Sequence, residues 1–125
     1  MLMHTSNEPP IVLVVEDEGL IRMAAADDLI DAGFTVLEAA NADQAIEVLE
    51  THPGISILLT DIDMPGSMDG IRLAHAVRKR WPPVKLVLVS GHKTPDTQDL
   101  PADSTFFTKP YDMARLSKVL WSLAN

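Results

Sequence analysis

Residues able to bind a cation or to take part in phosphate chemistry follow four apolar segments of the sequence. They are Glu16 and Asp17 after residues 11–15, Asp61 after 55–59, Ser90 and Gly91 after 84–89, and Lys109 after 105–108. If these segments end at one edge of the molecule, three carboxylates meet and repel one another, and a hard cation with oxygen ligands relieves that repulsion. We therefore expect Mg²⁺ at Glu16, Asp17 and Asp61.

The remaining groups complete a site suited to phosphoryl transfer. Mg²⁺ keeps several waters in its shell and leaves room for phosphate oxygens. Lys109 and the cation would neutralise charge on the equatorial oxygens of the transferred group, and the Ser90 hydroxyl would donate a hydrogen bond to one of them. Asp61 is the expected nucleophile.

The spacing of apolar residues predicts alternating strands and helices that bring the segment ends together. Short runs rich in Leu and β-branched residues predict strands at 11–15, 34–39, 55–59, 84–89 and 105–108. Helical spacing links Ile21, Ala24, Ala25, Leu29 and Ala32, then Ala42, Ala45, Ile46 and Leu49, then Leu73, Ala76 and Val77, and last Met113, Leu116, Leu120 and Leu123. This alternation indicates an α/β fold with an open, doubly wound parallel sheet and ligands at the carboxyl ends of its strands.

Local signals place some helix ends. Asn41, with Gln44 three residues later, forms a variant of the capping box and predicts the start of the second helix. Between residues 90 and 104 the helical pattern weakens, because Pro101 interrupts a segment that Thr94–Pro95 could begin. We expect the helix there, the fourth in chain order, to be short or absent.

Length and composition fit one small acidic domain. The chain has 125 residues, of which 46% are hydrophobic and 22% charged, and its net charge is −8. We expect residues 11–125 to form the domain after a disordered or extended tail at 1–10. The negative charge argues against direct DNA binding. Cysteine, an apolar N-terminal run and a membrane-length segment are all absent, which favours a cytoplasmic protein without membrane insertion.

Five short motifs, in order along the chain, resemble the receiver domains of bacterial two-component response regulators, in the stand-alone form of the chemotaxis receiver. They are Val14-Val15-Glu16-Asp17-Glu18, Leu59-Thr60-Asp61-Ile62-Asp63-Met64-Pro65, Met68-Asp69-Gly70, Ser90-Gly91 and Lys109-Pro110-Tyr111. The resemblance runs from residue 11 to the last helix. It implies a flavodoxin-like, five-stranded sheet with the strand order 2-1-3-4-5.

The resemblance also implies a phosphorelay function. Asp61 would accept a phosphoryl group from a phosphohistidine on a sensor histidine kinase or histidine phosphotransfer protein, with the backbone carbonyl of Asp63 as a further Mg²⁺ ligand. The Lys109–Pro110 bond would be cis. Phosphorylation would draw Ser90 toward the phosphate and turn Phe106 inward, and the switched form would bind an unknown downstream protein or relay the phosphoryl group.

Three features depart from the commonest pattern or set the timing of the switch. The loop Gly66-Ser67-Met68 is one residue longer than in the commonest receivers. In the family, the positions of Asp63 and His92 tune the phosphoryl lifetime, and our hypothesis is that both side chains influence the hydrolytic water.

Because nothing follows Asn125 in this sequence, we expect output through another protein.

Such a switch would phosphorylate itself with Mg²⁺ and dephosphorylate slowly, and it would not be an enzyme. Two other functions are alternatives to it. Asp61-Ile62-Asp63 superficially resembles the paired aspartates of haloacid-dehalogenase phosphohydrolases, although their motif normally follows the first strand. The chain could also be a pseudo-receiver that serves as a phosphorylation-independent scaffold. Stoichiometric labelling from acetyl phosphate would favour the switch, turnover of p-nitrophenyl phosphate the hydrolase, and failure to bind Mg²⁺ the scaffold.

Overall fold

Five parallel strands form a single sheet in the computed structural model, which describes residues 8–91 and 97–125. The strands are β1 (Ile11–Val15), β2 (Thr35–Ala39), β3 (Ile55–Asp61), β4 (Lys85–Ser90) and β5 (Thr105–Thr108). Their order across the sheet is β2-β1-β3-β4-β5, which confirms the predicted topology. The third strand is longer than predicted and includes Asp61 itself.

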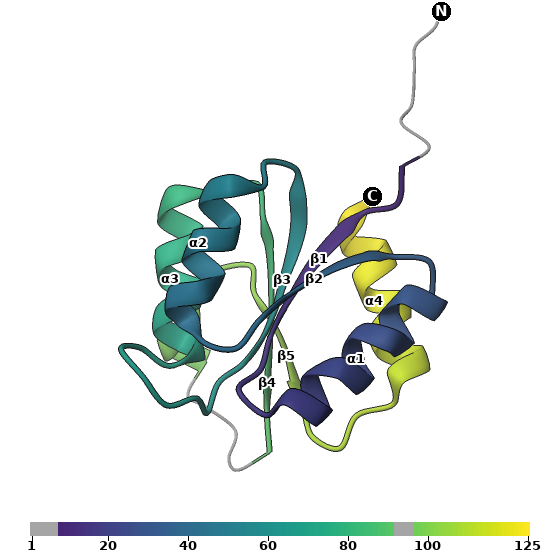
Figure 1. Ribbon diagram of the computed structural model, residues 1–125. Coiled ribbons are helices and arrows are strands. Elements are labelled where there is room, and N and C mark those ends of the chain that lie inside the picture. The colour runs from purple at the N-terminus through teal and green to yellow at the C-terminus, as the bar shows by residue number, and fades with distance from the viewer. Residues whose placement is uncertain (1–7, 92–96) are drawn as a thin grey trace, which may run out of the picture.

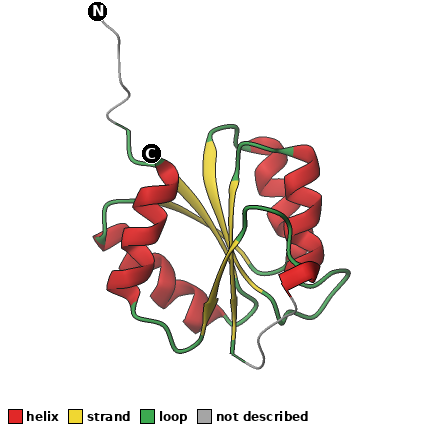
Figure 2. Ribbon diagram, turned by 180° about the vertical axis from the view of Figure 1, so that it is seen from behind, coloured by secondary structure: helices red, strands yellow, loops and turns green. Residues whose placement is uncertain are grey.

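Four α-helices cover the two faces of the sheet. They are α1 (Gly19–Asp31), α2 (Ala42–Thr51), α3 (Gly70–Arg80) and α4 (Met113–Ala124). Helices α2 and α3 lie on one face and α1 and α4 on the other, as Figure 1 shows and the reverse view in Figure 2 repeats. The doubly wound fold is therefore confirmed, and all five strands point their carboxyl ends toward the same edge.

Each face of the sheet has its own hydrophobic core. Alternate residues of β1 belong to different cores, because successive side chains of a strand point to opposite faces. Leu13 and Val15 pack on the side of α2 and α3, whereas Val12 and Val14 pack on the side of α1 and α4. All four are buried, so β1 is a central strand covered on both faces.

Capping side chains define where three of the helices begin. Asn41 accepts a hydrogen bond from the backbone nitrogen of Gln44 at 2.9 Å, and the side chain of Gln44 accepts one from the backbone of Ala40 at 2.9 Å. The predicted start of the second helix is thus confirmed. Asp69 and Asp112 cap α3 and α4 in the same way through their carboxylates.

The buried face of α1 differs from the prediction. Ala26 and Leu29 are its buried residues, whereas Ile21 and Ala24, which were expected in the core, are exposed. The spacing was right for Leu29, which is buried, and for Ala25 and Ala32, which pack against the core. It was wrong for Ile21 and Ala24, because α1 carries apolar residues on several sides and helical spacing alone does not identify the side that packs. Leu20, Met23 and Ile30 are also exposed.

The segment between β4 and β5 agrees with the prediction of a short or absent helix. Its described residues form one three-residue 3₁₀-helix, η1 (Thr97–Asp99), while Thr94–Pro95 lies outside the described residues. Side chains of α3 hold this segment: His75 Nε2 lies 2.7 Å from the carbonyl oxygen of Asp99, and Arg78 donates to that of Ala102 at 2.9 Å.

Candidate functional site

Backbone hydrogen bonds continue past the ends of the central strands and bring the polar residues together. The nitrogen of Ile62 donates to the carbonyl oxygen of Val89 at 2.9 Å, and the nitrogen of Lys109 donates to that of Ser90 at 2.9 Å. The residues that follow β3 and β5 are therefore held beside the last two residues of β4 at the carboxyl edge. This is the edge at which open α/β sheets bind their ligands.

Three acidic side chains meet at this edge. Ligand oxygens of Glu16, Asp17 and Asp61 all lie within 4.8 Å of one another. Glu16 is buried, Asp61 is half-buried and Asp17 is exposed. Partial desolvation and the neighbouring Glu16 raise the pKa of Asp17 above its ordinary value. The cluster thus carries unfavourable negative charge that a cation would relieve.

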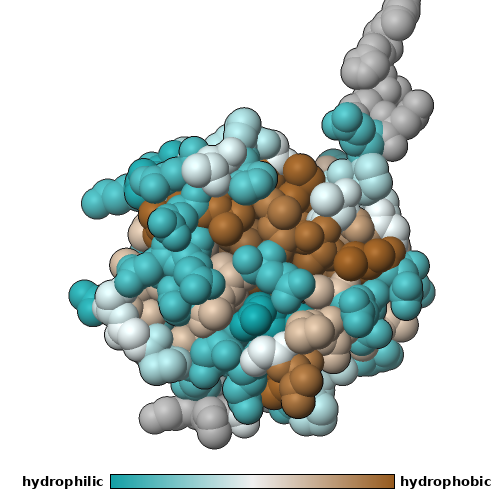
Figure 3. Space-filling view, in the orientation of Figure 1, coloured by the Kyte–Doolittle hydropathy of each residue, from teal (hydrophilic) through white to brown (hydrophobic). Residues whose placement is uncertain are grey.

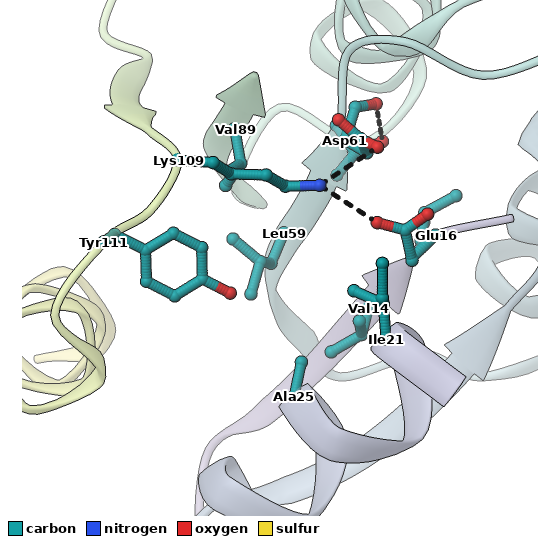
Figure 4. A pocket seen from close by; sticks show the side chains of 11 residues that line it. Val14, Glu16, Ile21, Ala25, Leu59, Asp61, Val89, Lys109 and Tyr111 are labelled. Carbon is teal, nitrogen blue, oxygen red and sulfur yellow. Dashed lines mark hydrogen bonds and ion pairs between the residues drawn. The ribbon is translucent and has the colours of Figure 1, made fainter. Parts of the chain in front are cut away.

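Lys109 bridges two of these carboxylates. Its Nζ lies 3.2 Å from Glu16 Oε1 and 3.3 Å from Asp61 Oδ2, and Figure 4 shows it between them. Desolvation alone would lower the pKa of Lys109, but the carboxylates of Asp61 and Glu16 together outweigh it and raise the pKa above its ordinary value. The lysine is therefore a fixed positive charge beside Asp61.

The other oxygen of Asp61 supports the expectation of a cation. Asp61 Oδ1 is buried and has no hydrogen-bond partner among the described residues. A buried oxygen without a partner is costly, especially on a carboxylate. Coordination to a hard divalent cation would satisfy it, and the oxygen-only donor set of Glu16, Asp17 and Asp61 suits Mg²⁺. The residues present therefore fit the expected metal.

Ser90 and Gly91 line the next part of the edge. Ser90 is 2% exposed, and its hydroxyl donates a hydrogen bond to Asp63 Oδ2 at 3.0 Å. A Cβ added to Gly91 would lie 3.6 Å from Cβ and Cδ of Lys109, so this glycine lies against the lysine side chain. The sequence placed Asp63 near the site but did not predict its bond to Ser90. His92 lies outside the described residues.

Phe106 lies on the same face of the sheet as Ser90. It pairs in register with Leu88, two residues before Ser90, and neighbouring residues at paired positions point to the same face. The Phe106 side chain is half-buried and packs against the core under α2 and α3. The Lys109–Pro110 peptide bond that follows this strand is cis.

Tyr111 and Arg22 belong to the site, although sequence reasoning did not select them. With Glu16, Asp61 and Lys109, Tyr111 lines a cavity of about 30 Å³, and Figure 4 shows its hydroxyl pointing inward; burial raises its pKa. Arg22 donates to the carbonyl oxygen of Glu16 at 2.9 Å, while its Nε pairs with Glu38 at 3.1 Å. In the sequence Tyr111 appeared only as the last residue of the Lys109-Pro110-Tyr111 motif, without a role of its own, and Arg22 had no signal.

A family model decides the classification of this arrangement. The model of the response regulator receiver domain matches residues 12–120. The chain belongs to the response regulator receiver family. Because the match runs from within β1 to within α4, the acidic cluster, Ser90 and Lys109 all lie inside the matched residues.

Individual receivers and receiver-containing proteins are similar to this chain. The sensor kinase CckA of Brucella abortus is 38% identical over 110 residues, which are 85% of this chain and 12% of the kinase. A response regulator receiver protein from Sinorhizobium medicae superposes with a TM-score of 0.87 at 30% identity, covering 96% of this chain and 98% of that one. The receiver domain of the hybrid histidine kinase CckA gives a TM-score of 0.77 at 31% identity, covering 92% and 99%.

The receiver spans only a small part of the curated kinase that it matches, so the similarity concerns the receiver domain and not the remainder of that protein. Within residues 8–91 and 97–125, no helix is both long enough and apolar enough to cross a lipid bilayer.

Proposed function

We propose that this receiver binds Mg²⁺ and accepts a phosphoryl group on Asp61 from a phosphohistidine. The observation that carries the proposal is the surroundings of Asp61, which contacts the cation Lys109 and has a carboxylate oxygen within 4.8 Å of those of Glu16 and Asp17. A carboxylate so placed can act as a nucleophile, because positive charge beside it stabilises the transferred group.

The transfer is a simple displacement at phosphorus. An oxygen of the Asp61 carboxylate attacks the phosphorus atom, a P–O bond forms, and the P–N bond to the donor imidazole breaks. The imidazole keeps the bonding electrons and takes a proton from solvent. Lys109 Nζ, which lies 3.3 Å from Asp61 Oδ2, neutralises charge on the equatorial oxygens, and the Ser90 hydroxyl donates to one of them.

Glu16, Asp17 and Asp61, with the backbone carbonyl of Asp63, would hold the Mg²⁺ ion. The ion would supply a second positive charge for the phosphoryl oxygens. Glu16 is well placed for this role because its carboxylate is already fixed, accepting from Lys109 at 3.2 Å and from the backbone nitrogen of Glu18 at 3.0 Å.

The phosphodonor would dock on α1. Leu20, Met23 and Ile30 are 84%, 53% and 53% exposed and recur on one side of this helix. Figure 3 shows hydrophobic side chains at the surface over α1, at the lower right of the molecule. Because α1 begins three residues after Glu16, a partner helix packed on this stripe would bring a phosphohistidine close to Asp61.

The phosphorylated receiver would then change conformation. Ser90 and Phe106 share a face of the sheet, and movement of the Ser90 hydroxyl toward a phosphoryl group would be accompanied by an inward turn of the half-buried phenylalanine. The altered surface would bind a downstream protein, or the phosphoryl group would pass to another histidine. Asp63 and His92 would set the lifetime of the phosphorylated state.

Labelling with acetyl phosphate tests the proposed function. Incubation with Mg²⁺ should add one phosphoryl group per chain, detected as a mass increase, and EDTA or the variant Asp61→Asn should abolish it. The control variant Asp103→Asn removes an exposed carboxylate outside the site and should label normally. Continuous turnover of p-nitrophenyl phosphate would favour a phosphohydrolase instead, and absence of both labelling and Mg²⁺ binding would favour a scaffold.

A further inference from the structure

The hydroxyl of Ser90 is held by a residue outside the acidic cluster. Ser90 Oγ donates to Asp63 Oδ2 at 3.0 Å. The hydrogen bond from Ile62 to Val89 fixes the backbone one residue before each partner, so the two side chains face each other across the ends of β3 and β4. Ser90 is almost fully buried, whereas Asp63 is exposed, so water reaches this bond from the side of the carboxylate and not from the side of the serine.

The hydroxyl makes this bond although an acceptor oxygen in the site has no partner. Asp61 Oδ2 receives a hydrogen bond from Lys109, but Asp61 Oδ1 is buried without a hydrogen-bond partner among the described residues. In the unphosphorylated receiver, the Ser90 proton therefore points to Asp63 and not to the phosphoacceptor.

A serine hydroxyl has one proton and can donate only one full hydrogen bond at a time. Donation to Asp63 and donation to a phosphoryl oxygen on Asp61 therefore exclude each other. We propose that Asp63 is a latch: its carboxylate holds the Ser90 hydroxyl in the unphosphorylated position and opposes the switch. This inference rests on the proposed function, and it assigns the Asp63 side chain a positioning role through Ser90.

The charge of Asp63 makes the latch effective. A hydrogen bond to an ionised carboxylate is stronger than one between neutral groups, so its loss weighs measurably on the switched state. The same charge would also repel a phosphoryl group directly, without any involvement of Ser90. An experiment must separate these two effects.

A double-mutant cycle separates them, because it measures only the part of the Asp63 effect that depends on Ser90. The four proteins are wild type, Asp63→Ala, Ser90→Ala and the double variant, and the probe is beryllofluoride with Mg²⁺, an analogue of the phosphoryl group. We expect Asp63→Ala to tighten beryllofluoride binding about tenfold when Ser90 is present, which is the size expected for one lost charge-assisted hydrogen bond. In the Ser90→Ala background we expect a clearly smaller gain, because only the direct repulsion by the Asp63 charge is then removed.

Two further measurements test whether Asp63 acts through Ser90. Asp63→Asn removes the charge but keeps an acceptor oxygen, and it should tighten binding less than Asp63→Ala. Thermal unfolding of the same four proteins without Mg²⁺ should show a favourable coupling between Asp63 and Ser90, since the bond exists before phosphorylation. Coupling of opposite effect in the two experiments is the signature of a latch and not of a merely structural contact.

The outcomes distinguish the latch from the function on which it rests. Equal tightening in both backgrounds would assign the effect to charge alone and overturn the latch, and so would no tightening in either. Failure of wild type to bind beryllofluoride, although it is folded, would overturn the proposed function and the latch with it.

Discussion

The backbone of Gly70 lies directly against the backbone of Asp61. A Cβ added to Gly70 would overlap the carbonyl oxygen of Asp61 and would lie 2.8 Å from the Cα of Ile62. The nitrogen of Gly70 also donates to the carbonyl oxygen of Ile62 at 2.9 Å. The first residue of α3 therefore packs directly against the backbone that carries the phosphoacceptor, and only glycine leaves room for this contact.

We predict that Gly70→Ala displaces Asp61 and impairs the site. Overlap with backbone atoms cannot be relieved by a side-chain rotation, so the variant should lose about 1–3 kcal/mol of unfolding free energy. Acetyl phosphate should label Gly70→Ala more slowly than it labels the control variant Gly19→Ala. Gly19 is the matched control because it also begins a helix, and its Cβ would meet only Arg22 at 3.8 Å. Equal behaviour of the two variants would contradict the prediction.

Lys109 should stabilise the receiver most when no metal is present. Lys109→Met leaves the buried carboxylate of Glu16 and the half-buried one of Asp61 without their shared cation. We expect a loss of about 1–3 kcal/mol without Mg²⁺, measured by chemical denaturation. Mg²⁺ should restore more stability to this variant than it adds to wild type, because it replaces the missing positive charge. The exposed Lys118→Met should show neither effect.

The sequence predicted the sheet well because its signals there are strong. The bounds of β1 and β5 match the prediction, and Asn41 marked the start of α2. The sequence did not fully identify the buried side of α1. Apolar residues lie on several sides of this helix, so tertiary contacts decide which side faces the core.

Within the site, the sequence located residues that end strands, because topology brings strand ends together. It did not locate groups that reach the site through side-chain conformation. The bond from Ser90 to Asp63 and the bond from Arg22 to the Glu16 carbonyl depend on rotamers and on residues far apart in the chain. Neither leaves a motif that spacing could reveal.

Without bound metal, the Asp17 carboxylate should lower the stability of the folded chain. Its pKa is raised in the folded chain, so its ionised form is less favourable there than in the unfolded chain, and its contribution to stability increases as the pH falls through that raised pKa toward the unfolded value. Asp17→Asn should therefore raise the free energy of unfolding at neutral pH without Mg²⁺. The gain should be only about a fraction of a kcal/mol, because solvent screens this exposed group.

With Mg²⁺ the wild type should become more stable than Asp17→Asn. Wild type gains stability from ligand binding, whereas Asp17→Asn lacks one of the expected carboxylate ligands and should gain much less. Differential scanning calorimetry with and without Mg²⁺ measures both parts. The hypothesis fails if the variant is less stable than wild type without the metal, or if both gain equally from it.

The apolar stripe of α1 should matter for protein phosphodonors and not for small ones. Leu20→Glu and Met23→Glu place charge on side chains that are 84% and 53% exposed, so neither substitution disturbs the core. We predict that both slow phosphoryl transfer from a phosphorylated histidine kinase or phosphotransfer protein about tenfold or more, because they disrupt the centre of a helix contact. Labelling by acetyl phosphate should be unchanged, since that donor needs no docking surface. Ser122→Glu, an exposed change on α4, is the control for added negative charge. A matching loss with acetyl phosphate would mean that α1 supports the fold of the site and does not recognise the donor.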